Sequence, residues 1–148
     1  MNHCAKTVFS VLFALLLTVG PCRASEKDWT VVTLARNGSW GISNASSLPE
    51  AITVAIASCR AMGNVSSDCG AQFRAARGEW VVANLCGTHR IIAAGRSLED
   101  AERQALMSEI SLQLVYVSDL PPCKRVVTVN PSGAVVRPYE VHSSSSGN

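Results

Sequence analysis

The chain has 148 residues, of which 47% are hydrophobic and 16% charged, and this length fits a single domain. Its 13 basic and 11 acidic side chains give a small positive surplus, which comes entirely from Lys6 and Arg23. Both lie in a segment that we expect to be removed, so the remaining chain is formally neutral. A nucleic-acid binder needs a surplus of Lys and Arg to displace counterions, so the composition excludes that class.

Residues 1–24 have the pattern of a secretory signal peptide. The run Val8–Val19 is almost wholly apolar but too short to cross a bilayer as a helix, which takes about 20 residues. Pro21 breaks the helix, and small residues stand three before and one before a cut after Ala24. A lipid anchor on Cys22 would need a small residue in front of it, where Pro21 stands. We therefore expect a periplasmic or secreted chain, residues 25–148, without an integral membrane segment.

The first half of this mature chain predicts two strands, a helix and a third strand. Strands over 29–35 and 40–44 flank Asn37-Gly38, which is a strong hairpin signal. Ser47, with Glu50 three residues on, predicts a capping box for a helix over 48–62, which Gly63 ends. A third strand is expected over 69–76.

The second half predicts the same order of elements. Strands over 79–86 and 91–94 precede a helix over 98–112, which Ser97 and Asp100 cap as Ser47 and Glu50 cap the first. A strand over 123–129 and a short edge strand over 134–136 follow. Residues 137–148 form a serine-rich tail that has nothing to bury.

The two halves are diverged copies of one unit. Asp28–Leu34 returns as Glu79–Leu85, 51 positions later, and Ser47–Ala51 returns as Ser97–Ala101, 50 positions later. Similarity at a fixed period indicates a repeated supersecondary unit. We therefore expect one α+β domain, residues 25–136, made of two repeats over about 28–77 and 78–130. Its predicted fold is a single antiparallel sheet, formed by two strand–strand–helix–strand units and covered on one face by both helices.

Four cysteines remain in the mature chain: Cys59, Cys69, Cys86 and Cys123. In an oxidising compartment an even number indicates two disulfides, with three possible pairings. The repeat favours one of them, because Cys69 and Cys123 stand at equivalent strand starts and Cys59 lies one short loop before Cys69. The second helix has Glu109 where the first has Cys59, so Cys123 has no partner on its own helix. We predict the pairs Cys59–Cys69 and Cys86–Cys123.

The chain lacks the residue patterns of common catalytic sites. Cys86 and His89 have a spacing that could supply two zinc ligands or a reactive thiol, but a disulfide at Cys86 removes both uses. A hydrolytic triad would have to use His89, and no glycine-rich phosphate loop occurs. Most acidic candidates stand at helix starts, where they suit the helix dipole. We predict no enzymatic activity, no cofactor and no metal.

Four arginines near the predicted strand turns could form one basic end: Arg74, Arg77, Arg90 and Arg96. They are a candidate binding surface. The plainer interpretation is that they are solvated charges at the rim of the domain. Glu109 is the one acidic residue on the inner face predicted for the second helix, which otherwise carries Leu98, Ala101, Ala105 and Leu112. Either it pairs with Arg90 or Arg96, or the helix turns it to solvent.

A resemblance to a known family is carried by Trp40-Gly41-Ile42, by the alanine-rich helix that ends near Cys59, and by Ala83–Gly87 and Ala93–Glu102. In these segments the chain resembles a bacterial family of small exported domains designated domain of unknown function 4189. The resemblance covers about residues 30–129. It implies export and a shared fold but no activity, and Glu109 stands where members often carry a cysteine.

These observations predict a non-catalytic, disulfide-stabilised exported domain that works by binding. The expected partner is another envelope or extracellular protein, such as a toxin or wall hydrolase that the domain inhibits, as immunity proteins do. One alternative is a structural component of the cell envelope. Another is a thiol-redox or zinc protein that uses Cys86 and His89.

Overall fold

The computed structural model describes residues 28–62, 68–115 and 119–136. Its strands are β1 Trp29–Leu34, β2 Trp40–Ala45, β3 Phe73–Arg77, β4 Trp80–Cys86, β5 His89–Gly95, β6 Lys124–Val129 and β7 Val135–Val136. Its helices are α1 Leu48–Met62 and α2 Leu98–Val115. The predicted order is confirmed, although α2 runs to Val115 rather than residue 112 and β3 begins at Phe73 rather than residue 69. The predicted leader and tail, residues 1–24 and 137–148, lie outside the described residues.

A serine precedes each helix, as the sequence predicts. The Ser97 hydroxyl accepts a hydrogen bond from the Asp100 N–H at 3.1 Å, which satisfies one of the donors that a first helical turn leaves unpaired. At α1, the Ser47 hydroxyl instead donates to the Glu50 carboxylate at 3.4 Å. The two capping residues therefore mark the helix starts correctly, but they act through different contacts.

The two copies form two separate antiparallel sheets. In the first, β1 is central, with β2 and β3 beside it; in the second, β4 is central, with β5 and β6 beside it, and β7 adds to β6. Trp29 pairs with Ala45 on β2 and with Arg77 on β3, and Trp80 pairs with Gly95 on β5 in the same way. This shared connectivity supports the duplicated unit that the repeat predicts.

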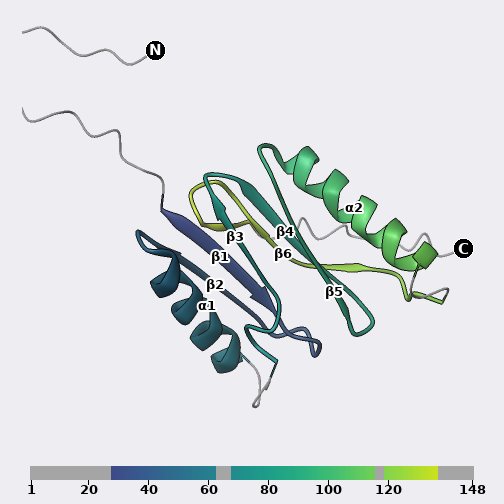
Figure 1. Ribbon diagram of the computed structural model, residues 1–148, viewed down its shortest axis with the longest axis horizontal. Helices are drawn as coiled ribbons and strands as arrows, with labels where there is room; N and C mark the ends of the chain where they lie inside the picture. The colour runs from purple at the N-terminus through teal and green to yellow at the C-terminus, as the bar shows by residue number, and fades with distance from the viewer. Residues whose placement is uncertain (1–27, 63–67, 116–118, 137–148) are drawn as a thin grey trace, which may run out of the picture.

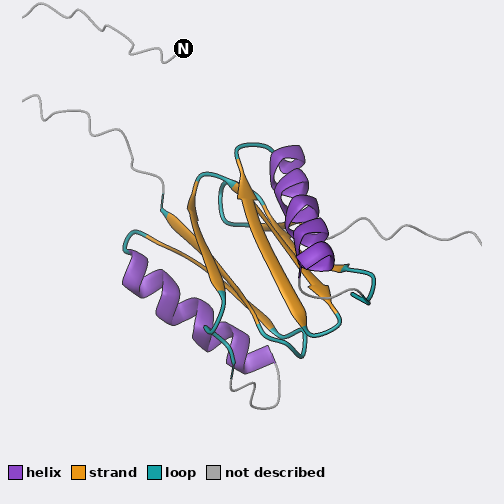
Figure 2. Ribbon diagram, turned by 45° about the vertical axis from the view of Figure 1, so that its right-hand side comes forward, coloured by secondary structure: helices purple, strands orange, loops and turns teal. Residues whose placement is uncertain are grey.

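The predicted single sheet with both helices on one face is wrong. The sheets pack face to face, with α1 on the outer side of the first and α2 on the outer side of the second, so the fold has four layers (Figure 1, Figure 2). The physical reason is that the central strands are apolar on both faces. Val31 packs against Ala51 and Ala55 of α1, while Val32 and Leu34 are buried between the sheets. A single sheet covered on one face would leave one of these two sets in water.

The core between the sheets joins the copies into one domain. It is the largest of the apolar clusters among the described residues and draws on both sheets. Its buried members are Val32, Leu34, Ala76, Val81, Ala83, Ala94, Val127 and Val129. Full burial of a valine or leucine side chain contributes about 1.5–3 kcal/mol, so each sheet exposes much of its stabilising surface if the other is removed.

Two hydrogen bonds link a side-chain amide of the first sheet to a backbone carbonyl oxygen of the second. Gln72 Nε2, just before β3, donates to the Arg90 carbonyl oxygen on β5 at 3.2 Å. Asn44 Nδ2 on β2 donates to the Ser132 carbonyl oxygen in the β6–β7 turn at 2.8 Å. Because each bond crosses from one copy to the other, together they fix the position of one sheet on its neighbour.

Candidate binding surface

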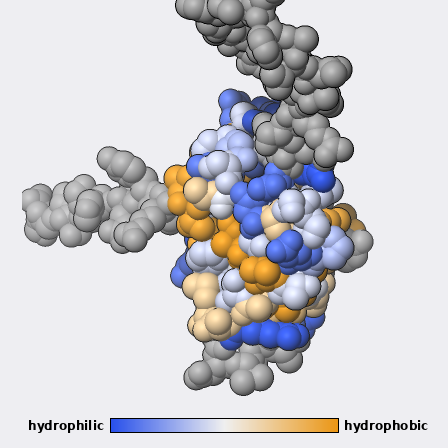
Figure 3. All heavy atoms as spheres, turned by 90° about the vertical axis from the view of Figure 1, so that its left-hand side faces the viewer, coloured by the Kyte–Doolittle hydropathy of each residue, from blue (hydrophilic) through white to orange (hydrophobic). Residues whose placement is uncertain are grey.

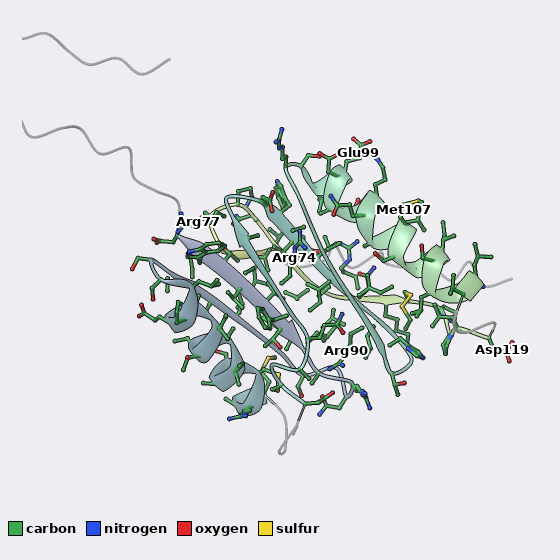
Figure 4. The ribbon with its side chains drawn as sticks, in the orientation of Figure 1. Arg74, Arg77, Arg90, Glu99, Met107 and Asp119 are labelled. Atoms are coloured by element: carbon green, nitrogen blue, oxygen red, sulfur yellow. A yellow bond between two sulfur atoms is a disulfide. The ribbon has the colours of Figure 1, made fainter. Side chains whose placement is uncertain are left out.

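Arg77 and Arg90, two of the arginines of the predicted basic end, lie at opposite ends of β1. β3 carries Arg74 and Arg77, and the Arg77 guanidinium lies 4.3 Å from the ring centroid of Trp29, at the start of β1. Arg90 lies at the other end of β1, where its Nη1 donates to the Leu34 carbonyl oxygen at 3.3 Å. At the usual rise per residue, β1 separates these two sites by roughly 17 Å. Figure 4 labels Arg77 and Arg90, which lie apart from each other.

Arg90 has a structural role. Its side chain is 12% exposed, and its Nη1 lies 3.0 Å from the Asp68 carboxylate. The same carboxylate accepts a hydrogen bond from the Arg36 N–H at 3.0 Å. Asp68 therefore holds the β1–β2 turn to β5, and Arg90 is occupied by this contact. The other candidates are exposed: Arg74, Arg77 and Arg96.

Both predicted disulfides are confirmed. Cys59–Cys69 ties the end of α1 to the turn before β3, and Cys86–Cys123 ties the end of β4 to the start of β6. With its sulfur in a bridge, Cys86 offers no thiolate to a metal or a substrate, although His89 is its pairing partner in the hairpin. In the part of the chain that the structure describes, no three metal-ligating side chains gather in one place.

α1 lies close to its sheet along most of its length. Ala51, Ala55 and Cys59, one turn apart, are fully buried. Gly41 on β2 permits this approach, because a Cβ there would overlap the Ala55 carbonyl oxygen and the Cys59 backbone nitrogen. The bridge from Cys59 to Cys69 then holds the end of the helix against the first copy.

α2 lies close to its sheet near its start. Its buried residues are Ala101 and Ala105, both in its first half. The tight approach is at Gly95, the last residue of β5, where a Cβ would overlap the backbone nitrogen of Ala101. The second half of α2 therefore lacks the close packing that α1 has along most of its length.

Two differences between the copies explain why the second half of α2 packs less closely on its sheet than α1 does. Ile91 has the hairpin position that Gly41 has in the first copy, and its buried side chain packs among the residues beneath α2. Glu109 stands in place of Cys59, so no bridge holds this part of the helix. Glu109 is half-buried, and among the described residues it forms neither of the ion pairs considered for it.

The second half of α2 exposes a ridge of large apolar side chains. Leu106, Met107, Ile110 and Leu114, which we call the α2 ridge, recur at helical spacing and are between 39% and 80% exposed. Figure 4 marks Met107 on α2, on the side of the helix away from the strands. The exposed parts of the ridge amount to about two complete side chains, whose burial would contribute about 3–6 kcal/mol.

A hollow of about 560 Å³ lies beside the ridge. It is lined by Met107, Ser108, Ser111, Leu112 and Val115. Between residues 104 and 115 of α2, Glu109 is the single charged side chain. Exposed aliphatic and methionine side chains with few charges are typical of the centre of a protein–protein interface.

The outer side of α1 offers no comparable surface. Its exposed large apolar residues are Val54 and Met62, two helical turns apart. Figure 3 views the molecule from this side, where hydrophobic residues form small groups between hydrophilic ones. Single apolar side chains are ordinary on a protein surface and need no partner. The α2 ridge is thus the surface feature of the described residues that calls for a function.

The inner face of α2 was predicted from the sequence, but the ridge was not. Ala101 and Ala105 are buried, as predicted. The signal for the ridge was present, because every fourth residue from 106 to 114 is apolar on a helix that already has an apolar inner face. Such a helix has more apolar surface than its own sheet covers.

Comparison of the chain with protein-family profiles, with curated proteins and with solved structures finds no match. The function of the α2 ridge therefore has to be inferred from its own shape, exposure and charge.

Proposed function

We propose that the protein is an exported, non-catalytic domain that binds another protein of the cell envelope through the α2 ridge. The observation that carries this proposal is the exposure of Leu106, Met107, Ile110 and Leu114 together on one helix face. Contiguous exposed apolar surface marks interaction sites on soluble proteins. The two disulfides support an oxidising, exported compartment, where such a partner would be met.

The charges of α2 favour a protein partner over a lipid surface. A helix that lies on a membrane usually carries Lys and Arg on its polar face, which anionic lipids attract. α2 instead carries four acidic residues and one basic residue, Arg103, which pairs with Glu99 and Asp100. In the described part of the chain, neither helix is long and apolar enough to cross a membrane.

Inhibition is the role that fits a ridge of this shape. A helix with apolar residues at every fourth position fits a concave hydrophobic groove. Active-site clefts are concave and mostly apolar, so a toxin or a wall hydrolase offers such a groove. We therefore propose an inhibitory or immunity-type protein that occupies the groove of its partner with α2.

A structural role in the cell envelope is the second candidate, and β7 favours it. This short edge strand exposes Val135 and Val136, and an open sheet edge can pair with another chain. In that case the sheet edge, rather than the α2 ridge, would carry the contacts.

Affinity capture from envelope extract tests the proposal. The bait is the mature chain, residues 25–148, as wild type, as Leu114→Glu and as Val54→Glu. Leu114 is 80% exposed, so the substitution leaves the core intact, and Val54 gives the same change at a 46% exposed position on α1. We expect wild type and Val54→Glu to retain one stoichiometric partner and Leu114→Glu to lose it.

Titration of the purified partner then measures how much each substitution weakens binding. We expect Leu114→Glu to weaken binding by at least about 10-fold, because a charge replaces the most exposed apolar contact of the ridge. Equal retention by Leu114→Glu would contradict binding through the ridge. Sedimentation of all three variants with the cell wall, without a stoichiometric partner, would favour the structural role.

A further inference from the structure

We infer that Asn37 is a site of spontaneous covalent modification, at which the backbone nitrogen of Gly38 displaces ammonia from the side-chain carboxamide. The reaction needs no enzyme, and the inference does not depend on the α2 ridge. The product carries a carboxylate in the β1–β2 turn, where the sequence specifies an amide. The residue after Asn37, the contacts of the turn and the contacts of the other asparagines each support it.

The reaction closes a five-membered ring and then opens it. The Gly38 N–H gives up its proton, the nitrogen attacks the Asn37 Cγ, and the Cγ–Nδ2 bond breaks, so that ammonia leaves with that proton. The resulting succinimide adds water at one of its two carbonyl groups. Addition at one carbonyl gives aspartate, and addition at the other gives isoaspartate, whose backbone runs through the former side chain. Water is the one co-reactant, and nothing is oxidised or reduced.

Glycine after asparagine removes the main obstacle to this attack. A Cβ on the following residue crowds the Asn Cγ as it approaches the backbone nitrogen, and Gly38 has none. Asn37 is the one asparagine of the sequence that glycine follows. Gly38 has a φ of +88°, which the turn requires and other residues rarely adopt. The dipeptide that makes the hairpin therefore also makes the reactive site.

The β1–β2 turn presents Asn37 for this reaction. Asn37 is exposed, and its Oδ1 accepts a hydrogen bond from the Ser39 N–H at 3.0 Å. Because this bond spans Gly38, it turns the carboxamide back toward the Gly38 backbone. The Gly38 N–H donates to the Ala35 carbonyl oxygen at 3.0 Å. This bond lies in a surface turn, where local opening costs far less than unfolding, so the nitrogen becomes available while the core stays folded.

The two asparagines within strands have side chains held by other contacts. Asn44 Nδ2 on β2 donates to the Ser132 carbonyl oxygen at 2.8 Å. Asn84 Oδ1 on β4 accepts from Arg125 Nε at 2.7 Å. The residue after each of them carries a Cβ. Both sites therefore lack the glycine and the free carboxamide nitrogen or exposed turn that favour the reaction at Asn37.

Asn130, in the β6–β7 turn, is a control that the molecule itself supplies. Its Oδ1 accepts a hydrogen bond from the Ser132 N–H at 3.0 Å, the same contact that Asn37 makes with Ser39. The next residue is Pro131, whose nitrogen has no proton to lose. The geometry of the side chain is thus shared by the two turns, and the attacking nitrogen is present in one of them.

The modification adds a negative charge close to the contact that joins the two copies. The Arg36 N–H, one residue before Asn37, donates to the Asp68 carboxylate that also pairs with Arg90. Isoaspartate in addition lengthens the backbone of the turn by one carbon. Conversion at Asn37 therefore yields a chain of altered charge and altered turn, with the core residues unchanged.

Peptide mapping by mass spectrometry tests the inference on the purified mature chain, incubated at neutral and at mildly alkaline pH. We expect conversion at Asn37 before any at Asn44, Asn84 or Asn130, and a rate that rises with pH because the Gly38 nitrogen must lose its proton. Both aspartate and isoaspartate should appear at residue 37. Conversion of another of these asparagines first, an intact Asn37 after prolonged alkaline incubation, or aspartate without isoaspartate would overturn the inference.

Two variants test the role of each residue in the reaction. Asn37→Gln keeps the amide but lengthens the side chain, so isoelectric focusing should show an acidic band that grows with time in wild type and is lost in this variant. Pro131→Gly supplies a nitrogen with a proton after Asn130, and we expect that residue to begin to react. Persistence of the acidic band in Asn37→Gln, or an inert Asn130 in Pro131→Gly, would contradict attack by the following nitrogen.

Discussion

At the scale of single residues, the contact of Asp68 with Arg90 joins the two copies. Asp68 belongs to the first copy and Arg90 to the second, and the Arg90 side chain is 12% exposed. A charge so little exposed depends on a paired counter-ion. The Arg36 N–H donates to the same carboxylate, so one side chain fixes both a turn and a strand.

Asp68→Asn should lower the free energy of unfolding by about 1–3 kcal/mol, because it leaves the Arg90 guanidinium without its counter-ion. This range is below that of a fully buried pair, since the Asp68 side chain is 27% exposed and water screens part of the interaction. Urea denaturation of the mature chain measures the change.

Glu99→Gln is the matched control for Asp68→Asn. Glu99 pairs with Arg103 on the surface of α2, with side chains 86% and 61% exposed respectively, so its loss should cost less than about 0.5 kcal/mol. If the two variants were equally stable, Asp68 would not hold the copies together.

At the scale of elements, α1 and α2 start from equivalent positions but pack differently. The second residue of β2, which faces α1, is Gly41, and the equivalent position of β5 is Ile91. The close approach of α1 thus depends on one missing side chain.

Gly41→Ala should destabilise the fold by about 1–3 kcal/mol, because the added methyl group overlaps the backbone of α1 at Ala55 and Cys59. Chemical denaturation of the oxidised protein measures the loss. Ser46→Ala, at an exposed position after the same strand, should stay within about 0.5 kcal/mol of wild type. Wild-type stability of Gly41→Ala would mean that α1 lies farther from β2 than the structure places it.

At the scale of the whole molecule, the disulfides tie each copy at a different place. The chain-entropy estimate assigns about 3 kcal/mol to Cys59–Cys69 and about 4 kcal/mol to Cys86–Cys123, because the second closes the longer loop. The sequence separations are 10 and 37 residues. A net stability of about 5–15 kcal/mol is usual for a domain, so both bridges matter.

Replacing Cys86 and Cys123 together by alanine should therefore lower the unfolding free energy more than replacing Cys59 and Cys69 together. Thermal denaturation with and without reductant measures each bridge, and alkylation under denaturing conditions should find no free thiol in the native mature chain. Labelling of any of the four cysteines before reduction, or a melting temperature that reductant does not change, would contradict two closed bridges.

Most of the connectivity could be predicted from the sequence because it depends on local signals and on the repeat. Asn37-Gly38 predicts the first hairpin, Ser47 and Ser97 predict the helix starts, and the two tryptophan-led strands predict equivalent halves. The number of sheets was predicted wrongly. The missed signal is that β1 and β4 carry adjacent valines, Val31-Val32 and Val81-Val82, and so place apolar residues on both faces, whereas a strand covered on one face alternates between apolar and polar residues.

The candidate surface was less predictable than the fold. Arg90 and Asp68 meet only after the sheets pack, so nothing in the sequence around Arg90 distinguishes a buried partner from a surface charge. The ridge lies on the face of α2 opposite the buried Ala101 and Ala105, so its exposure depends on the absence of a further layer over that face among the described residues. Spacing within a helix predicts which residues share a face, but the neighbouring layer decides whether that face is covered.

The unequal packing of α1 and α2 also bears on how such a molecule can change over generations. A substitution at Gly41 or Cys59 disturbs the interior, because Gly41 lets α1 approach β2 and Cys59 is bridged to Cys69. Substitutions at Leu106, Met107, Ile110 and Leu114 leave the interior as it is, because these side chains are exposed. The descendant chains can therefore retain one architecture while the contacts offered by the second half diverge from lineage to lineage.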